Sequence, residues 1–171
     1  MTSQSTNIHK LLSELTKDAT SYYIKQDNRL SSETVNGNTI FSKYKLFKGK
    51  ITDALIEKHI NREIELAISI KDANVLVFEY RGNEVYAFKV LLTSLAKYEG
   101  VNDIVIVNYD VNSLTILLQL EKHIDKDSLK MRLEKLLEDK LPKEWRVLPL
   151  ENKPNLANLL YLPHEAFLNF D

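Results

Sequence analysis

The order of the apolar segments after residue 74 is the feature that most limits how this chain can fold. Six segments alternate between strand-like and helix-like patterns, at residues 75–80, 84–98, 104–107, 114–120, 126–140 and 146–150. The first, VLVFEY, is nearly all apolar and β-prone, as in a central strand covered on both faces. The second and fifth repeat apolar residues every three or four positions, as amphipathic helices do. The resulting order, β-α-β-β-α-β, predicts a ferredoxin-like (RRM-like) core in a mixed α/β (α+β) protein.

Residues 1–60 form a separate N-terminal portion in this prediction. The elements expected before residue 74 are a helix at 8–23, a polar loop with a turn at Gly37, a strand at 39–47, a helix at 51–61 and a strand at 63–70. The chain is therefore expected to be a single domain over residues 1–171. It would have a helical and extended N-terminal portion (1–60) and an RRM-like core (61–171).

Several classes of chemistry are excluded or disfavoured by composition. The 171 residues contain no cysteine, which excludes disulfides, thiolate metal sites and cysteine nucleophiles. The glycine-rich phosphate loops are missing, and the four histidines lie too far apart for a short-range metal-ligand pattern. The N-terminus lacks an apolar signal core, and no apolar run is long enough to cross a membrane. We therefore expect a cytoplasmic protein with no membrane partner and no cofactor.

The central predicted strand carries one carboxylate where metal-dependent phosphate chemistry would need two. Paired carboxylates at a strand end can hold Mg²⁺. Here Glu79 is followed on the same face by Arg81, which is a cation at the position of the second ligand. The sequence therefore predicts no catalytic residue and no metal ligand.

Basic residues form two modest groups in a chain whose net charge is −1, so any contact with a polyanion has to be local. The first group runs through the extended segment at Lys43, Lys45, Lys48 and Lys50, with Tyr44 and Phe47 between the lysines. Such interleaving is typical of surfaces that bind single-stranded nucleic acid or a nucleotide base. The second group lies near predicted strand ends and turns, at Arg81, Lys143, Arg146 and Lys153. The simpler interpretation of both groups is a solvated charged face.

The same order of segments resembles the archaeo-eukaryotic primase superfamily. Members of that family carry a strand of pattern hhDhD (h, apolar), a segment SGxxGxH and a late segment hhRhPxSlH. The matching segments here are VLVFEYR (75–81), IVNYDVNSLTI (106–116) and NLLYLPHEAF (158–167), and NREIELAIS (61–69) is similar to an upstream strand of the catalytic subunit. The resemblance covers residues 61–167 and keeps their order.

The functional residues of that family are replaced at the matching positions. The replacements are Glu79 and Arg81 for the paired aspartates, Thr115 for the histidine, and Asn158 or Tyr161 for the late arginine. The resemblance therefore implies a catalytically degenerate member. In size, composition and missing chemistry, the chain is similar to the small non-catalytic third subunit of archaeal primases of the Sulfolobus group.

Such a subunit would assist primer initiation in DNA replication. Its partners would be the catalytic and large primase subunits, and it would hold an NTP, ssDNA or a primer end through a local basic patch. The candidate nucleotide- and nucleic-acid-binding residues are Lys45, Lys48, Arg62, Arg81, Arg146 and His164. Arginine suits this role because its guanidinium can contact a phosphate through two hydrogen bonds.

Two other functions stay open on the sequence alone. The first is a protein-interaction domain without a nucleic-acid ligand, which the near-neutral charge favours and in which the amphipathic N-terminal helix would dock. The second is a cryptic metal-dependent primase-polymerase or nuclease. Its carboxylates would converge in space from Glu63 or Glu65, Glu79, Asp110 and Glu151.

Overall fold

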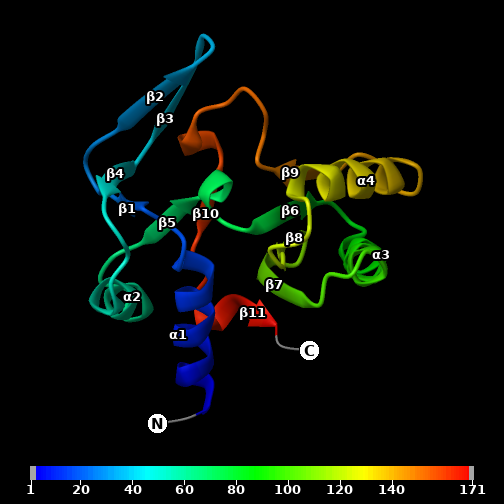
Figure 1. Ribbon diagram of the computed structural model, residues 1–171, viewed down its shortest axis with the longest axis horizontal. Coiled ribbons are helices and arrows are strands. Elements are labelled where there is room, and N and C mark those ends of the chain that lie inside the picture. The colour runs from blue at the N-terminus through cyan, green and yellow to red at the C-terminus, as the bar shows by residue number, and fades with distance from the viewer. Residues whose placement is uncertain (1–2, 170–171) are drawn as a thin grey trace. The chain divides into compact units, whose positions relative to one another are not determined.

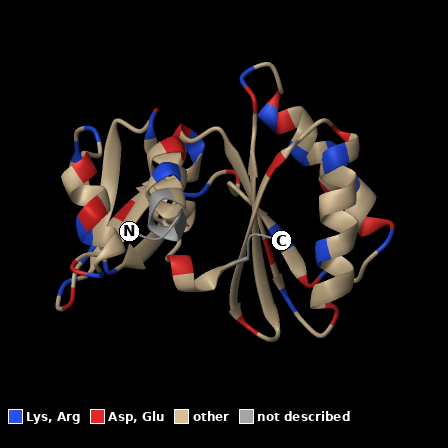
Figure 2. Cartoon of the chain, turned by 90° about the horizontal axis from the view of Figure 1, so that it is seen from below, with Lys and Arg blue, Asp and Glu red and all other residues tan. Residues whose placement is uncertain are grey.

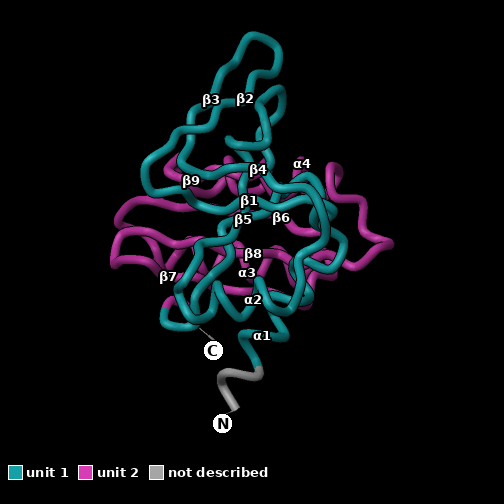
Figure 3. The backbone as a smooth tube through the Cα atoms, turned by 90° about the vertical axis from the view of Figure 1, so that its left-hand side faces the viewer, with its two compact units in different colours: residues 1–73, 149–166 teal, residues 74–148, 167–171 magenta. Residues whose placement is uncertain are grey.

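The computed structural model describes residues 3–169 as a mixed α/β (α+β) protein of two compact units. Unit 1 comprises residues 1–73 and 149–166, and unit 2 comprises residues 74–148 and 167–171 (Figure 3). Unit 2 is one continuous stretch of chain with a short C-terminal addition. Unit 1 is completed only when the chain returns after residue 148.

Unit 2 has the predicted β-α-β-β-α-β order (Figure 1). Its elements are β6 (Val75–Arg81), α3 (Val85–Tyr98), β7 (Asp103–Asp110), β8 (Ser113–Gln119), α4 (Lys126–Glu138), β9 (Trp145–Leu148) and β11 (Leu168–Asn169). The antiparallel sheet runs β11-β7-β8-β6-β9, so β6 lies between β8 and β9 as the ferredoxin-like arrangement requires. Figure 2 shows the two long helices of this unit on one face of its sheet, with charged segments along both.

The side chains of β6 alternate between the two faces of the sheet, and only the end of the strand is exposed. Leu76, Phe78 and Tyr80 pack in one buried cluster with residues of α3 and α4, such as Phe88 and Leu133. Glu79 and Arg81 have the opposite parity and therefore point to the other face. The strand thus contributes an apolar face to the core and a polar end to the surface.

The helix boundaries in unit 2 follow local capping. The α3 helix is terminated by Gly100, which lies just beyond its last residue, Tyr98, and has a φ of +87°, as predicted. The start of α4 was expected at Asp127 or Ser128, but the capping residue is Asp125, whose carboxylate accepts the Ser128 N–H at 2.8 Å. This contact and a further one with Asp127 lower the pKa of Asp125.

Unit 1 consists of two helices, a four-stranded sheet and a hairpin. Its elements are α1 (Ser3–Thr16), β1 (Ser21–Lys25), β2 (Ser31–Val35), β3 (Asn38–Ser42), β4 (Tyr44–Lys48), α2 (Asp53–Ile60), β5 (Leu66–Ser69), the 3₁₀ turns η1 (Ile70–Asp72), η2 (Asn155–Ala157) and η3 (Glu165–Phe167), and β10 (Leu159–Tyr161). The sheet runs β10-β5-β1-β4 and is antiparallel throughout.

Two predictions for the N-terminal portion are corrected by the structure. The first helix ends at Thr16, and Ser21–Lys25 forms β1, because these residues pair with both β4 and β5. The polar segment expected as a loop contains β2, which pairs with β3 across a turn at Asn36–Gly37. Both turn residues have positive φ, at 50° and 78°, which is the conformation that an Asn-Gly hairpin turn favours.

The RRM-like core also begins later than expected. Residues 61–73 were assigned to it, but β5 pairs with β1 and β10 of unit 1. The core sheet starts at Val75 instead. Among the described residues, no helix is long and apolar enough to cross a membrane.

Candidate functional site

A pocket of about 700 Å³ lies at the ends of four strands in unit 2. Its lining comprises Glu79, Tyr80, Arg81, Tyr109, Asp110, Ser113, Leu114, Thr115, Lys143, Glu144, Trp145 and Arg146. These residues come from the end of β6, the β7–β8 turn and the start of β9. The register of β7 against β8 shifts between Val107 and Asp110, and such an irregularity redirects the side chains beside it. We call this the strand-end pocket.

The centre of the strand-end pocket is an ion pair between neighbouring strands. Glu79 on β6 lies directly opposite Arg146 on β9, and Arg146 Nε donates to Glu79 Oε2 at 2.5 Å. On the other side of β6, Glu79 lies opposite Thr115 of β8. Arg81 lies two residues further along, on the same face as Glu79. Sequence reasoning selected Arg81 and Arg146 separately, and the structure brings both into this pocket.

One side of the strand-end pocket is fixed by a chain of hydrogen bonds. Tyr80 Oη donates to Glu144 Oε2 at 2.9 Å and accepts the Glu84 N–H at 2.8 Å. Burial is the main cause that raises the pKa of Tyr80, so its hydroxyl keeps the proton that it donates. A Cβ at Gly82 would lie 2.2 Å from Glu144 Oε2 and 2.7 Å from Tyr80 Oη, so a larger residue would displace the exposed Glu144 carboxylate.

Trp145 contributes an unused donor to the same wall. The residue is 5% exposed, and its indole Nε1 is buried without a hydrogen-bond partner among the described residues. The Lys143 ammonium lies over its ring, 5.9 Å from the centroid.

The acidic residues of the strand-end pocket do not gather as metal ligands. Within the described part of the chain, the one group of three metal-ligating side chains lies elsewhere, at His59, Glu65 and His164. Glu79 is paired with Arg146, and Glu144 accepts from Tyr80. Of the carboxylates considered for a cryptic metal site, Glu65 belongs to that second group.

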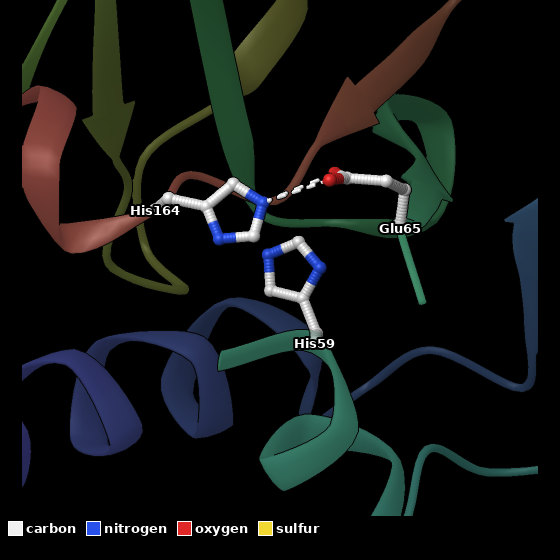
Figure 4. A group of neighbouring side chains, drawn as sticks. All are labelled: His59, Glu65 and His164. Carbon is white, nitrogen blue, oxygen red and sulfur yellow. Dashed lines mark hydrogen bonds and ion pairs between the residues drawn. The ribbon is translucent and has the colours of Figure 1, made fainter. Parts of the chain in front are cut away.

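The second group is a cluster of one carboxylate and two stacked imidazoles in unit 1 (Figure 4). His59 comes from α2, Glu65 immediately precedes β5 and His164 follows β10. His164 Nε2 lies 3.0 and 3.2 Å from the two Glu65 carboxylate oxygens. The two imidazole rings are 4.2 Å apart between centroids, with 15° between their planes. We call these three residues the histidine cluster.

His59 is held as a neutral ring inside the fold. Its side chain is fully buried, Nδ1 accepts the Leu66 N–H at 3.1 Å, and Nε2 lies 3.4 Å from the carbonyl oxygen of Pro163. These contacts use the Nε2-protonated tautomer, since Nδ1 must be free to accept. Burial, and next the charge of His164, lower the pKa of His59 below its ordinary value.

The histidine cluster has the residue types of a zinc site but not the orientation of one. A metal ion lies in the plane of every imidazole that binds it, and two nearly parallel stacked planes share no such point. One ring would have to turn before both histidines could hold an ion. For His59 this would also remove its hydrogen bond to the Leu66 N–H, leaving a buried donor unsatisfied. In the observed arrangement, the cluster therefore fixes the orientation of the two imidazole rings and the nitrogen that carries the proton in each.

The six candidate residues fall into three places. Arg81 and Arg146 share the strand-end pocket, whereas Arg62 and His164 line a smaller pocket in unit 1. Lys45 and Lys48 lie on β4, at the edge of the unit 1 sheet. Residues three apart in a strand project to opposite faces, so these two lysines do not share a face. Lys45 lies opposite Ile24 and Lys48 opposite Ser21, and the Lys45 ammonium is 5.4 Å from the Phe47 ring centroid.

Sequence reasoning did not predict the histidine cluster. Its members are separated by up to 105 positions, so no local spacing links them. His164 and Glu65 were each considered for separate reasons, but nothing in the local sequence links either of them to His59. The sequence matches none of the known protein-family models, and no curated protein matches it.

Proposed function

We propose that this chain is a non-catalytic accessory subunit of a DNA primase, which holds the phosphate of a nucleotide or primer end in the strand-end pocket. The observation that carries this proposal is the pairing of Glu79 with Arg146 beside Arg81 at the end of the central strand. In the primase superfamily, which the segment order resembles, this strand carries the metal-binding aspartates. Here the corresponding positions present one neutralised carboxylate and a free cation.

The charges in the strand-end pocket favour binding over catalysis. Three cations and three carboxylates line it, but all three carboxylates are already engaged, by Arg146, by Tyr80 and by the Asn112 N–H. The Arg81 guanidinium makes no hydrogen bond or ion pair with the residues that the structure describes, and it is exposed. An arginine placed in this way suits a two-pronged contact with phosphate oxygens. The ring of Tyr109, 50% exposed, could stack against a base.

A protein-interaction domain is the second candidate, and the surface of α3 supports it. Tyr86, Val90 and Tyr98 are 76%, 45% and 87% exposed on this helix. Exposed aromatic side chains are enriched where proteins bind one another. In the primase proposal this surface would face the catalytic or large subunit, so the two candidates differ in whether the strand-end pocket binds phosphate.

A binding titration at two salt concentrations separates the candidates. ATP and a 5′-phosphorylated single-stranded oligonucleotide would be titrated at about 50 and about 200 mM salt. We expect binding that weakens with salt, and the Arg81→Gln/Arg146→Gln double variant should lose most of the affinity and lower the salt slope by about two. Arg132→Gln is the matched control, because Arg132 lies on α4 and pairs with Glu99. Equal binding by the double variant and wild type would contradict the proposal.

A variant of Glu79 distinguishes binding from hidden catalysis. Glu79→Gln frees Arg146 from its ion pair and removes a negative charge, so phosphate affinity should rise. A metal-dependent polymerase would instead lose Mg²⁺-dependent activity when this carboxylate is removed. Weaker ATP binding by Glu79→Gln, together with loss of a Mg²⁺-dependent activity that wild type shows, would favour the enzyme.

A further inference from the structure

A second pocket, of about 230 Å³, lies in unit 1 where the end of α2 meets the segment after β10. Its wall contains the apolar residues Ile8, Ile60, Pro163 and Ala166 and the polar residues Arg62, His164 and Glu165. Its volume is sufficient for one small anion with a short organic group. We call it the Arg62 pocket.

The backbone at Arg62 adopts a conformation that normally belongs to glycine. The end of α2 is closed by two hydrogen bonds, from the Arg62 N–H to His59 O at 3.0 Å and from the Glu63 N–H to Lys58 O at 2.9 Å. This is the helix ending in which the residue at the Arg62 position takes a left-handed φ, here 62°. A side chain is disfavoured there because its Cβ crowds the next carbonyl oxygen. Arginine therefore weakens the helix end that it closes.

The cost of this backbone conformation is not offset by any polar contact of the exposed Arg62 side chain with the described residues. Its guanidinium forms no hydrogen bond or ion pair with any other described residue, although it lines a pocket. Strained residues that persist in native proteins gather at functional sites. An unpaired arginine in a strained backbone, at the wall of a cavity, indicates a ligand that the arginine contacts.

His164 is the second polar group of the pocket, and the histidine cluster fixes its orientation. Its side chain is 12% exposed, its ring stacks on His59 and Nε2 is engaged by Glu65. In Figure 4, Nδ1 of this ring is turned away from Glu65. Nδ1 can therefore accept the hydroxyl of a hydrogen phosphate or, on a protonated ring, donate to a phosphate oxygen.

We propose that Arg62 and His164 bind a phosphate group in the Arg62 pocket. The guanidinium supplies two parallel donors to the phosphate oxygens, and His164 supplies a third contact at a fixed angle. Ile8 and Ile60 form an apolar wall beside these contacts. Glu165 is exposed at the pocket and repels the anion, so its removal should tighten binding. The pocket lies wholly in unit 1, and the proposal does not depend on the primase function.

The decisive variant is Arg62→Gly, because the backbone favours glycine at this position whereas phosphate binding requires the arginine. Inorganic phosphate and glycerol 3-phosphate would be titrated separately into the full chain and followed by NMR. In wild type, shifts should appear at His164 and around residue 62. Arg62→Gly should weaken binding about tenfold or more while leaving the melting temperature unchanged or higher. Arg29→Gly removes another exposed arginine of unit 1 and should bind as wild type does.

The comparison of the two ligands identifies the source of the phosphate. Tighter binding of glycerol 3-phosphate points to a phosphate ester, and equal or weaker binding points to the free ion. Arg81→Gln, in unit 2, should leave both titrations unchanged. The proposal is overturned if Arg62→Gly binds phosphate as tightly as wild type, or if wild-type shifts spread over the lysines of β4 and spare His164. A lower melting temperature for Arg62→Gly would show that the arginine serves the fold instead.

Discussion

His59 illustrates how burial at a single residue makes the whole fold sensitive to pH. The ring is neutral in the folded chain, because charging it would place an ion in the interior and lose the acceptor for the Leu66 N–H. The His164 ring stacked on it opposes a second charge, while Glu65 acts in the other direction more weakly. The net effect lowers the pKa of His59 from its ordinary value of 6.5.

The free energy of unfolding should therefore fall as the pH falls below about 6.5. In that range the unfolded chain takes up a proton on His59 that the folded chain excludes, whereas above it both states are neutral and stability is complete. Urea unfolding between about pH 5 and 8 measures this dependence. His59→Gln should flatten the curve, since an amide can accept the Leu66 N–H without titrating. His123→Gln, at a histidine 74% exposed, is the control that should leave the curve unchanged.

At the residue scale, the sequence predicted contacts only where a strand repeat links the residues. Glu79 and Arg81 were placed on one face of one strand because two positions separate them, and the structure has them there. Arg146 was a candidate, but its pairing with Glu79 depends on the register of β9 against β6, which no local pattern encodes. The same holds for His59 and His164, whose stacking depends on how α2 and the segment after β10 meet.

At the scale of elements, the helices of unit 2 are held by their buried faces. Leu133 of α4 is fully buried in the cluster that also contains Phe78 and Phe88, whereas Met131 on the same helix is 70% exposed. The two residues are close in sequence and similar in size. They therefore separate the effect of burial from that of helix propensity.

Leu133→Ala should lower the free energy of unfolding by about 2–5 kcal/mol, through lost burial and a residual cavity. Met131→Ala should change it by less than about 0.5 kcal/mol, because an exposed side chain gives up little on removal. Chemical denaturation of both variants beside wild type measures the difference. Equal losses would mean that α4 does not pack on the sheet as described.

Gly82 sets the geometry of the strand-end pocket at the turn before α3. In Gly82→Ala, the new Cβ would displace the Glu144 carboxylate and break its hydrogen bond with Tyr80. We expect a loss of about 1 kcal/mol in unfolding free energy. Glu144→Ala supplies the control: in that background the glycine substitution should cost clearly less. If Gly82→Ala costs as much in the Glu144→Ala background as in wild type, the new Cβ clashes with Tyr80 and not with Glu144.

The elements of unit 2 were predictable, and those of unit 1 less so, for a physical reason. Each segment of unit 2 has an apolar pattern that agrees with its final structure, and the two helices are followed by Gly100 and Pro142. In unit 1, Tyr22 and Tyr23 happen to continue the helical spacing of α1, but pairing with β4 and β5 makes them a strand. The β2 segment, SSETV, is too polar for a strand pattern and is specified by the Asn-Gly turn and its partner β3.

At the scale of the whole molecule, the two units differ in how the chain builds them. All buried members of the unit 2 core cluster lie between Leu76 and Val147. Unit 1 requires the chain to return, since β10 completes its sheet and Leu156 joins Tyr23 and Ala67 in its buried cluster. No segment pattern predicts such a return, which is why the core was expected to begin at residue 61.

A fragment of residues 74–148 should therefore fold alone, whereas a fragment of residues 1–73 should not. The first contains its complete core cluster and four strands of its sheet, and the second lacks β10, one of the two strands that pair with β5. Circular dichroism during urea unfolding measures this, with a cooperative transition expected only for 74–148. A cooperative transition for 1–73 would show that β10 is dispensable.

The central claim is that the chain assists primer synthesis without catalysing it, and primer synthesis itself tests this most directly. The chain would be assayed with NTPs, Mg²⁺ and single-stranded template, alone and together with the catalytic and large subunits of an archaeal primase. We predict no product from the chain alone. We predict more initiation when it joins the other subunits, and loss of that gain in Arg81→Gln/Arg146→Gln. Primers made by the chain alone and abolished by Glu79→Gln would contradict the account, as would initiation that the chain leaves unchanged.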